Sequence, residues 1–137
     1  MILEALDLQQ LTQKQEQIHL DHQLSVEHIL PQKATLEQWP VPVYAQTSEA
    51  ETQAYLNRRN LMLHTIGNLT LLTQPLNSII SNGSFARKQP EITQQSSLRL
   101  NSYFQKFSIH DTWDEMTISK RGTELFEDAL KIWPQPE

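Results

Sequence analysis

Two short segments with the pattern of β-strands constrain the fold of this chain more than any other feature. The first, residues 24–30, alternates along an extended backbone, with Val26, His28 and Leu30 on one face and Ser25, Glu27 and Ile29 on the other. The second, residues 69–72, is a run of Leu and Thr that follows a glycine. A long connection separates the two segments, so we expect the order strand, long insertion, strand and helix, wrapped by further helices.

Helical patterns account for most of the remaining sequence. The expected helices cover residues 1–23, 49–63, 74–80, 85–89, 94–107 and 118–133. The last five follow potential N-cap residues, which are Ser48, Thr73, Ser84, Thr93 and Thr117. Pro75 suits a first helical turn, whereas Pro90 is expected to end the helix that Ser84 begins.

Apolar spacing predicts which side chains of these helices face the core. The expected inward residues are Ile2, Leu6, Leu11, Ile18 and Leu20 in the first helix, Leu100, Tyr103, Phe104 and Phe107 in the fifth, and Ile118, Leu125, Ala129 and Trp133 in the last. Residues 31–47 contain three prolines and are predicted to form an irregular connection held by Trp39 and Tyr44.

These elements indicate an α+β fold that is mostly helical. A chain of 137 residues is long enough for one domain with one core. We expect a single domain in three parts: an N-terminal helix over residues 1–23, a core with a long insertion over residues 24–90, and C-terminal helices over residues 91–137.

Composition excludes several classes of site. The chain has no cysteine, which excludes disulfides, thiolate nucleophiles and cysteine-ligated zinc, and its three glycines are too few for a glycine-rich phosphate loop. No apolar run approaches the roughly 18 residues that cross a bilayer. The first residues are acidic and lack the basic segment of a signal peptide, so we expect a cytoplasmic protein without a membrane partner.

Charge is distributed unevenly along the chain. The net charge is −5, which by itself argues against nucleic-acid binding. Residues 57–110, however, carry six bases and one acid, whereas the segments on either side are acidic. Such asymmetry can place an anion-binding face on an acidic protein, although a chance distribution is the simpler alternative.

Glu27 and His28 form the first chemically suggestive pair. They combine a carboxylate with an imidazole at the end of a strand that Pro31 terminates. Neighbouring residues on a strand point to opposite faces, yet both can serve one site at the strand edge. Taken alone, such a pair is more often a surface glutamate beside a partly buried histidine.

A second polar group surrounds the second strand. Gly67 permits a tight turn, Asn68 can hold a neighbouring loop by hydrogen bonds, and Asn77 falls in the first turn of the next helix, facing the strands. An amide oxygen is a hard ligand suited to Mg²⁺ or Mn²⁺. Read alone, both asparagines are more often helix or turn caps.

Taken together, these motifs resemble a known nuclease family. The matching segments are Val-Glu-His-Ile-Leu-Pro-Gln at 26–32, Gly-Asn-Leu-Thr-Leu-Leu at 67–72, Asn77, Ser-Asn-Gly-Ser-Phe at 81–85, Lys88, Trp113 and the pattern that ends at Trp133. They resemble the HNH nuclease domain at the C-terminal end of GmrSD-type, modification-dependent restriction endonucleases. The resemblance implies a ββα-metal (His-Me finger) core, and it makes residues 24–90 the catalytic part of the chain.

The resemblance also implies roles for individual residues. His28 would be the general base, Asn68 the loop-orienting asparagine, and Glu27 and Asn77 the ligands of one Mg²⁺ or Mn²⁺ ion. A neutral imidazole suits deprotonation of water near pH 7. The chain departs from the pattern in three respects: Glu27 stands where many HNH enzymes have aspartate, the interval between His28 and Asn68 is long, and no zinc-binding cysteines brace the core.

Contacts to DNA are expected from the basic middle of the chain and its surroundings. Arg87 and Lys88, with Lys33 and Asn82, are the residues predicted to contact the nucleic acid. His64 lies just before the second motif and has two interpretations. A packed residue at a helix end is favoured over a phosphate contact in the same cleft.

Three functional hypotheses follow. The first is a metal-dependent DNA endonuclease that restricts modified DNA together with a nucleotide-dependent recognition domain or subunit. The second is a catalytically silent module that binds a partner protein, which the retention of all four motif residues argues against. An RNA-directed nuclease is the third, because the site acts on a phosphodiester in either nucleic acid.

Overall fold

A two-stranded antiparallel sheet lies at the centre of the computed structural model, which describes residues 2–10, 23–108, 110–134 and 136. Strand β1 (Leu24–His28) pairs with β2 (Leu69–Thr73), so that Glu27 lies opposite Thr70 and His28 opposite Leu69. Both strands were expected from the sequence, and both are present. Their pairing brings the motif around His28 beside the motif around Asn68.

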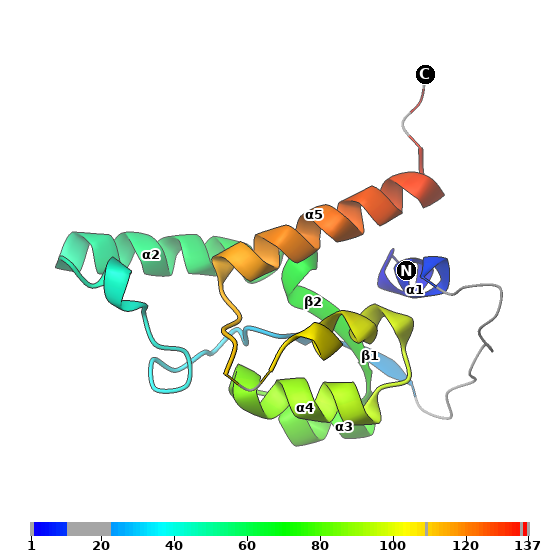
Figure 1. Cartoon of the computed structure of the whole chain (residues 1–137), viewed down its shortest axis with the longest axis horizontal. Coiled ribbons are helices and arrows are strands. Elements are labelled where there is room, and N and C mark those ends of the chain that lie inside the picture. The colour runs from blue at the N-terminus through cyan, green and yellow to red at the C-terminus, as the bar shows by residue number, and fades with distance from the viewer. Residues whose placement is uncertain (1, 11–22, 109, 135, 137) are drawn as a thin grey trace.

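Helices cover the sheet on two sides. They are α1 (Ile2–Gln9), α2 (Glu49–Met62), α3 (Gln74–Ile80), α4 (Phe85–Gln95) and α5 (Glu115–Ile132), with short 3₁₀ segments η1 (Val43–Ala45), η2 (Ile66–Asn68) and η3 (Arg99–Lys106). Figure 1 shows the strands between a layer that contains α2 and α5 and a layer that contains α3 and α4. The expected fold class, α+β and mostly helical, is confirmed.

Two neighbouring apolar clusters form the main core. The larger one joins Ile29, Leu72, Phe104, Trp113 and Ile118, and therefore connects β2 and the residue after β1 to η3 and α5. The smaller one packs Leu3 and Leu6 of α1 against Leu71 and Leu125, among others. Each buried side chain of this kind stabilises the fold by about 1.5–3 kcal/mol relative to exposure.

Helix α5 crosses the sheet at its junction with η2. A Cβ atom on Gly67 would lie 2.0 Å from the carbonyl oxygen of Ile118, so only glycine allows this approach. The turn itself needs no glycine, because no glycine among the described residues has a positive φ. The buried Arg121 completes the junction by donating from Nη1 to the carbonyl oxygens of Gly67, at 3.0 Å, and Leu69, at 2.6 Å. Burial lowers the pKa of Arg121 to about 10.

Several sequence predictions about α2 and α3 are confirmed. Ser48 caps α2, since its Oγ accepts a hydrogen bond of 3.1 Å from the backbone N–H of Glu51. Helix α3 begins directly after β2 and carries a proline in its first turn. It ends at a turn in which Asn82 adopts a left-handed φ of 64°, and asparagine tolerates that conformation.

The prediction for residues 84–107 was wrong in its helix boundaries. Helix α4 continues through Pro90 to Gln95, Thr93 lies inside it rather than capping a new helix, and residues 99–106 form the 3₁₀ segment η3. A proline inside a helix costs about 3 kcal/mol. The buried face of α4, which includes Phe85 and Ile92, offsets this cost.

The start of α5 and two expected core positions also differ from the predictions. Asp114 is the N-cap of α5, and Thr117 is its capping-box partner at the third helical position. Ile118 and Leu125 are buried as expected, whereas Trp133 is 51% exposed. In α1 the buried side chains include Leu6 as predicted, but Ile2 is exposed. Leu11, Ile18 and Leu20 lie outside the described residues.

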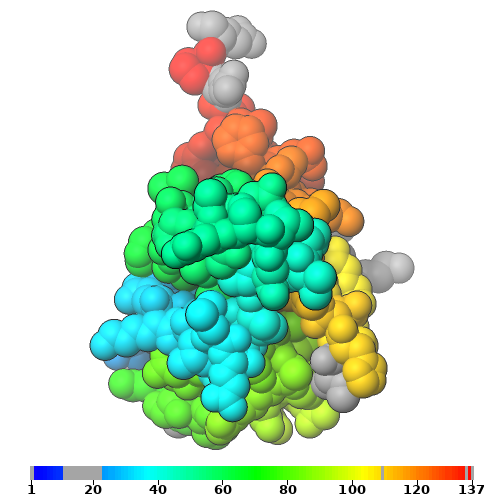
Figure 2. All heavy atoms as spheres, turned by 90° about the vertical axis from the view of Figure 1, so that its left-hand side faces the viewer, coloured from blue at the N-terminus to red at the C-terminus, as the bar shows by residue number. Residues whose placement is uncertain are grey.

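The long connection between β1 and α2 covers one end of the molecule. Figure 2 shows residues 31–47 in cyan on this face, beneath α2. Trp39 is buried and anchors the connection as expected, whereas Tyr44 is mostly exposed. In the part of the chain that the structure describes, no helix combines the length and apolar character needed to cross a bilayer.

Candidate functional site

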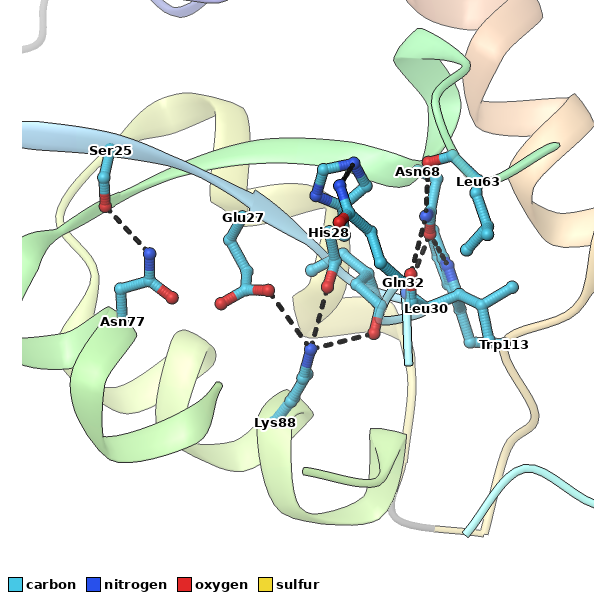
Figure 3. Close-up of polar contacts among 11 residues, drawn as sticks. Ser25, Glu27, His28, Leu30, Gln32, Leu63, Asn68, Asn77, Lys88 and Trp113 are labelled. Atoms are coloured by element: carbon cyan, nitrogen blue, oxygen red, sulfur yellow. Dashed lines mark hydrogen bonds and ion pairs between the residues drawn. The ribbon is translucent and has the colours of Figure 1, made fainter. Parts of the chain in front are cut away.

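The end of β1 presents Glu27 and His28 on opposite sides of the strand. Glu27 faces α3 and α4 and is buried, whereas His28 is half-buried and faces the end of α2 (Figure 3). This alternation was predicted from the strand pattern. The imidazole is therefore the more accessible of the two groups.

Lys88 of α4 reaches the inner side of this strand end. Its Nζ lies 3.3 Å from Oε1 of Glu27, and it donates to the backbone carbonyl oxygens of His28 at 2.8 Å and Ile29 at 3.0 Å. The Lys88 side chain has no exposed surface. Glu27 and Lys88 thus form a buried ion pair that links α4 to β1.

Burial perturbs both members of this pair. Desolvation raises the pKa of Glu27 above its usual value, and the positive charge of Lys88 offsets part of that rise. Desolvation likewise lowers the pKa of Lys88, and Glu27 offsets part of the decrease. Each charge therefore stabilises the other in a position where either one alone would be costly.

The second oxygen of Glu27 and the side chain of Asn77 fit a metal site. Oε2 of Glu27 is buried and has no hydrogen-bond partner among the described residues. Asn77 donates from Nδ2 to Oγ of Ser25 at 2.9 Å, which leaves its oxygen on the side of Glu27 (Figure 3). One carboxylate oxygen and one amide oxygen are ligands that Mg²⁺ and Mn²⁺ accept.

Other metal-binding arrangements are not evident in the described ranges. Within residues 2–10, 23–108, 110–134 and 136, no three histidine, aspartate or glutamate side chains gather closely enough to hold an ion. An ion between Glu27 and Asn77 would therefore need water and substrate oxygens to complete its shell.

His28 has a second histidine beside it. Its Nε2 lies 3.1 Å from Nδ1 of His64, and the two rings meet edge to face. The side-chain nitrogen of Gln32 is 3.4 Å from the same His28 atom. His64 directly follows the C-cap of α2 and is exposed, so it lies at the helix end beside His28 but is not packed there.

The surroundings of His28 favour its neutral form. Desolvation lowers the pKa of His28 first, followed by the positive charges of His64 and Lys88. A neutral imidazole is the form that can accept a proton from water. The protonation state near pH 7 therefore suits a general base.

Asn68 anchors the segment that follows His28. Its Oδ1 accepts from the backbone N–H of Leu30 at 2.8 Å and from Nε1 of Trp113 at 3.0 Å. Its Nδ2 donates to the carbonyl oxygens of Leu30 at 3.0 Å and Leu63 at 2.9 Å. The completely buried amide thus uses its full hydrogen-bonding capacity to clamp Leu30, two residues beyond His28.

The residues predicted to contact DNA separate into two groups. Lys33, Asn82 and Arg87 are exposed, and Arg87 also donates to the carbonyl oxygen of Ile79 at 2.9 Å. Lys88 is instead buried with all of its ammonium protons directed at oxygen atoms of β1 and the residue after it. Its expected contact with phosphate is therefore corrected to an internal contact.

Sequence reasoning missed the inward position of Lys88 because it ended the helix at Pro90. The buried residues of α4 are Phe85, Lys88, Gln89 and Ile92, which follow the spacing of one helix face. A helix drawn through Pro90 would have shown this stripe. The hydrogen bond that Trp113 donates to Asn68 carried no sequence signal.

A cavity of about 380 Å³ lies apart from the four motif residues, under the connection of residues 31–47. It is lined by aromatic side chains that include Trp39 and Tyr55, and by the segment of residues 110–114. None of the four motif residues lines this cavity. The candidate site therefore lies outside this cavity.

Comparison with known protein families identifies the family of this chain. The family model of the C-terminal domain of GmrSD restriction endonucleases matches residues 1–128. No curated protein and no solved structure matches the chain. A family match over nearly the whole chain shows a domain of the restriction endonuclease type, whose substrate is DNA. The chain belongs to the family of the GmrSD restriction endonuclease C-terminal domain.

Proposed function

We propose that this chain is a metal-dependent DNA endonuclease domain of the HNH type. One observation carries the proposal: Oε2 of Glu27 is buried, has no hydrogen-bond partner among the described residues, and lies beside the amide of Asn77. Glu27 belongs to the same strand, β1, as His28. The family match supports cleavage of DNA. We further propose that the domain acts in the cytoplasm against modified DNA, together with a nucleotide-dependent recognition domain or subunit.

The proposed base and the proposed metal ligands lie on opposite sides of β1. His28 accepts a proton from the attacking water at Nε2, so His64 has to leave this atom when water enters. Asn68 keeps the His28 backbone oriented through its bonds to Leu30. Glu27 and Asn77 would hold one Mg²⁺ or Mn²⁺ ion, which supplies charge stabilisation at the scissile phosphate and the leaving oxygen.

A plasmid-nicking assay tests this proposal directly. The wild-type chain should nick DNA with Mg²⁺ or Mn²⁺ and lose activity in EDTA. His28→Ala should lower the rate by a factor of about 10²–10⁴, the usual contribution of a general base. His110→Ala removes an exposed histidine outside the site and should leave the rate unchanged. Full activity of His28→Ala would remove this residue from the mechanism.

Substitution of Asn77 tests the metal assignment. Asn77→Ala should abolish metal-dependent nicking, whereas Asn77→Asp should retain activity because it still offers an oxygen ligand. A crystal soaked in Mn²⁺ should give an anomalous peak between Glu27 and Asn77. A peak elsewhere would overturn the assignment.

The alternative of a silent interaction module has one observation in its favour. The ion pair with Lys88 already satisfies one oxygen of Glu27 and neutralises its charge. A wild-type chain that binds no Mn²⁺ in the presence of DNA and nicks no plasmid would favour this alternative.

A further inference from the structure

We propose that Lys88 is a positioning residue of the candidate site, whose buried ammonium holds Glu27 and the backbone of His28 so that the second Glu27 oxygen is free to bind the metal ion. This inference rests on the proposed function. It assigns Lys88 a role that differs from the DNA contact expected from its charge.

The hydrogen-bonding capacity of Lys88 is fully used inside the protein. An ammonium group has three protons, and Nζ has three oxygen partners: Oε1 of Glu27 and the carbonyl oxygens of His28 and Ile29. The side chain has no exposed surface. Lys88 therefore cannot reach a phosphate without breaking these contacts.

All three partners lie at the strand end that carries the proposed chemistry. Lys88 contacts one oxygen of the proposed ligand Glu27 and the backbone oxygen of the proposed base His28 (Figure 3). The contact leaves Oε2 of Glu27 as a buried oxygen with no partner among the described residues. Lys88 thus determines which carboxylate oxygen remains available.

The position of the ammonium is rigid because α4 is anchored on both sides of Lys88. Phe85 packs against Trp113 with the rings stacked at 5.5 Å, and Ile92 is completely buried in the same cluster. Gln89 donates to the carbonyl oxygens of Phe104 at 3.0 Å and Phe107 at 2.7 Å. The helix therefore holds Lys88 at a fixed point beneath β1.

A purely structural ion pair is the competing explanation. Removing one partner of such a pair, as in Lys88→Met, would destabilise the fold but would leave metal affinity unchanged. Groups that orient a metal ligand behave differently, since their removal lowers metal affinity or activity by about 10–100-fold. Direct measurement of metal binding separates the two explanations.

The first experiment measures Mn²⁺ binding to the full chain in the presence of a DNA duplex. All variants carry His28→Ala, because loss of the proposed base keeps the DNA from being cleaved during the measurement. Lys88→Met should weaken Mn²⁺ binding at least tenfold, as judged by electron paramagnetic resonance, while thermal unfolding remains cooperative. Lys120→Met is the matched control, because Lys120 is exposed on α5, and it should bind Mn²⁺ as tightly as the background chain. Glu27→Gln should abolish binding.

The second experiment restores the ammonium chemically. The chain has no cysteine, so Lys88→Cys creates a single thiol that bromoethylamine converts, in the unfolded chain, to a close analogue of lysine. Bromopropane gives a side chain of the same length that ends in a methyl group. After refolding, the aminoethylated protein should recover Mn²⁺ binding and nicking, whereas the propylated protein should recover neither.

Each outcome decides between the explanations. Unchanged Mn²⁺ binding in Lys88→Met, or equal recovery with both alkyl groups, would overturn the positioning role while wild-type nicking still supports the proposed function. Loss of folding in Lys88→Met and in both alkylated proteins would make Lys88 a stability residue and would also overturn it. A wild-type chain that neither binds Mn²⁺ nor nicks DNA would overturn the proposed function and this inference together.

Discussion

Asn68 combines a structural role with a position next to the proposed chemistry. It is completely buried and joins η2 to Leu30, Leu63 and Trp113 through four hydrogen bonds. Its own backbone oxygen accepts from the N–H of Ile29 at 2.9 Å. The segment after His28 therefore depends on one side chain that lies far from it in sequence.

Asn68→Ala should destabilise the protein strongly. Four polar groups would lose their partner, and each buried unsatisfied group costs about 1–3 kcal/mol, so the free energy of unfolding should fall by at least about 3 kcal/mol. Urea denaturation measures the loss. Asn57→Ala, at an exposed position of α2, should change it by less than about 0.5 kcal/mol. A small effect of Asn68→Ala would show that water replaces these contacts.

The pair of His28 and His64 predicts the pH dependence of cleavage. Because burial and neighbouring positive charges lower the pKa of His28, its neutral form should persist below its ordinary value of 6.5. The acid limb of the pH–rate profile should therefore lie below pH 6.5. His64→Ala removes one of these charges and should move the limb upward, toward 6.5.

His110→Ala provides the control for this shift, because His110 is exposed and outside the site. It should leave the acid limb in place. An acid limb that moves downward in His64→Ala would contradict the assigned electrostatic effect of His64 on His28.

At the scale of elements, the crossing of α5 over η2 holds the second motif in place. Gly67 lies directly against the backbone of α5, and Gly122 occupies the facing position on the helix. The space for a side chain differs between the two positions. A Cβ on Gly67 would meet backbone at 2.0 Å, whereas a Cβ on Gly122 would make an ordinary contact at 3.7 Å.

These two glycines should respond in opposite ways to the same substitution. Gly67→Ala should displace α5 from η2 and lower the unfolding midpoint in thermal denaturation, with nicking activity reduced as Asn68 moves. Gly122→Ala should raise the free energy of unfolding by about 0.5–1 kcal/mol, since alanine is the better residue inside a helix. Equal effects of both substitutions would contradict the close approach at Gly67.

At the scale of the whole molecule, folding redistributes the basic charge of the middle segment. Arg59 is buried and donates from Nη1 to the carbonyl oxygen of Trp39 at 2.7 Å, and Lys88 is buried against Glu27. Nε of Arg58 lies 3.7 Å from Oε1 of Glu115, so these two side chains form an ion pair. The basic side chains available to DNA are therefore fewer than the sequence suggests, and Arg87 and Lys33 remain among the exposed ones.

The salt dependence of DNA binding should reflect this redistribution. A double variant with Lys33→Ala and Arg87→Ala should reduce the slope of log affinity against log salt concentration by about one to two, because each lost phosphate contact contributes roughly 0.9. Lys88→Met, measured in EDTA, should leave the slope unchanged because Lys88 is buried. A reduced slope in Lys88→Met would show that Lys88 leaves Glu27 to contact phosphate.

The sequence by itself determined the features that a few neighbouring residues encode. The two strands, the Ser48 cap and the start of α3 follow from local patterns, and each was predicted near its observed place. The joint motif around His28 and Asn68 likewise identified the family, because residue types at fixed spacings survive without knowledge of their contacts.

Only the tertiary structure decided how distant residues meet. Helix α4 continues through Pro90 because its buried face outweighs the local cost of proline, and this continuation places Lys88 beneath Glu27. His64 reaches His28 only because η2 and β2 fold back along β1. Propensity and spacing act over a few residues, whereas burial and hydrogen bonding between segments depend on packing across the whole chain.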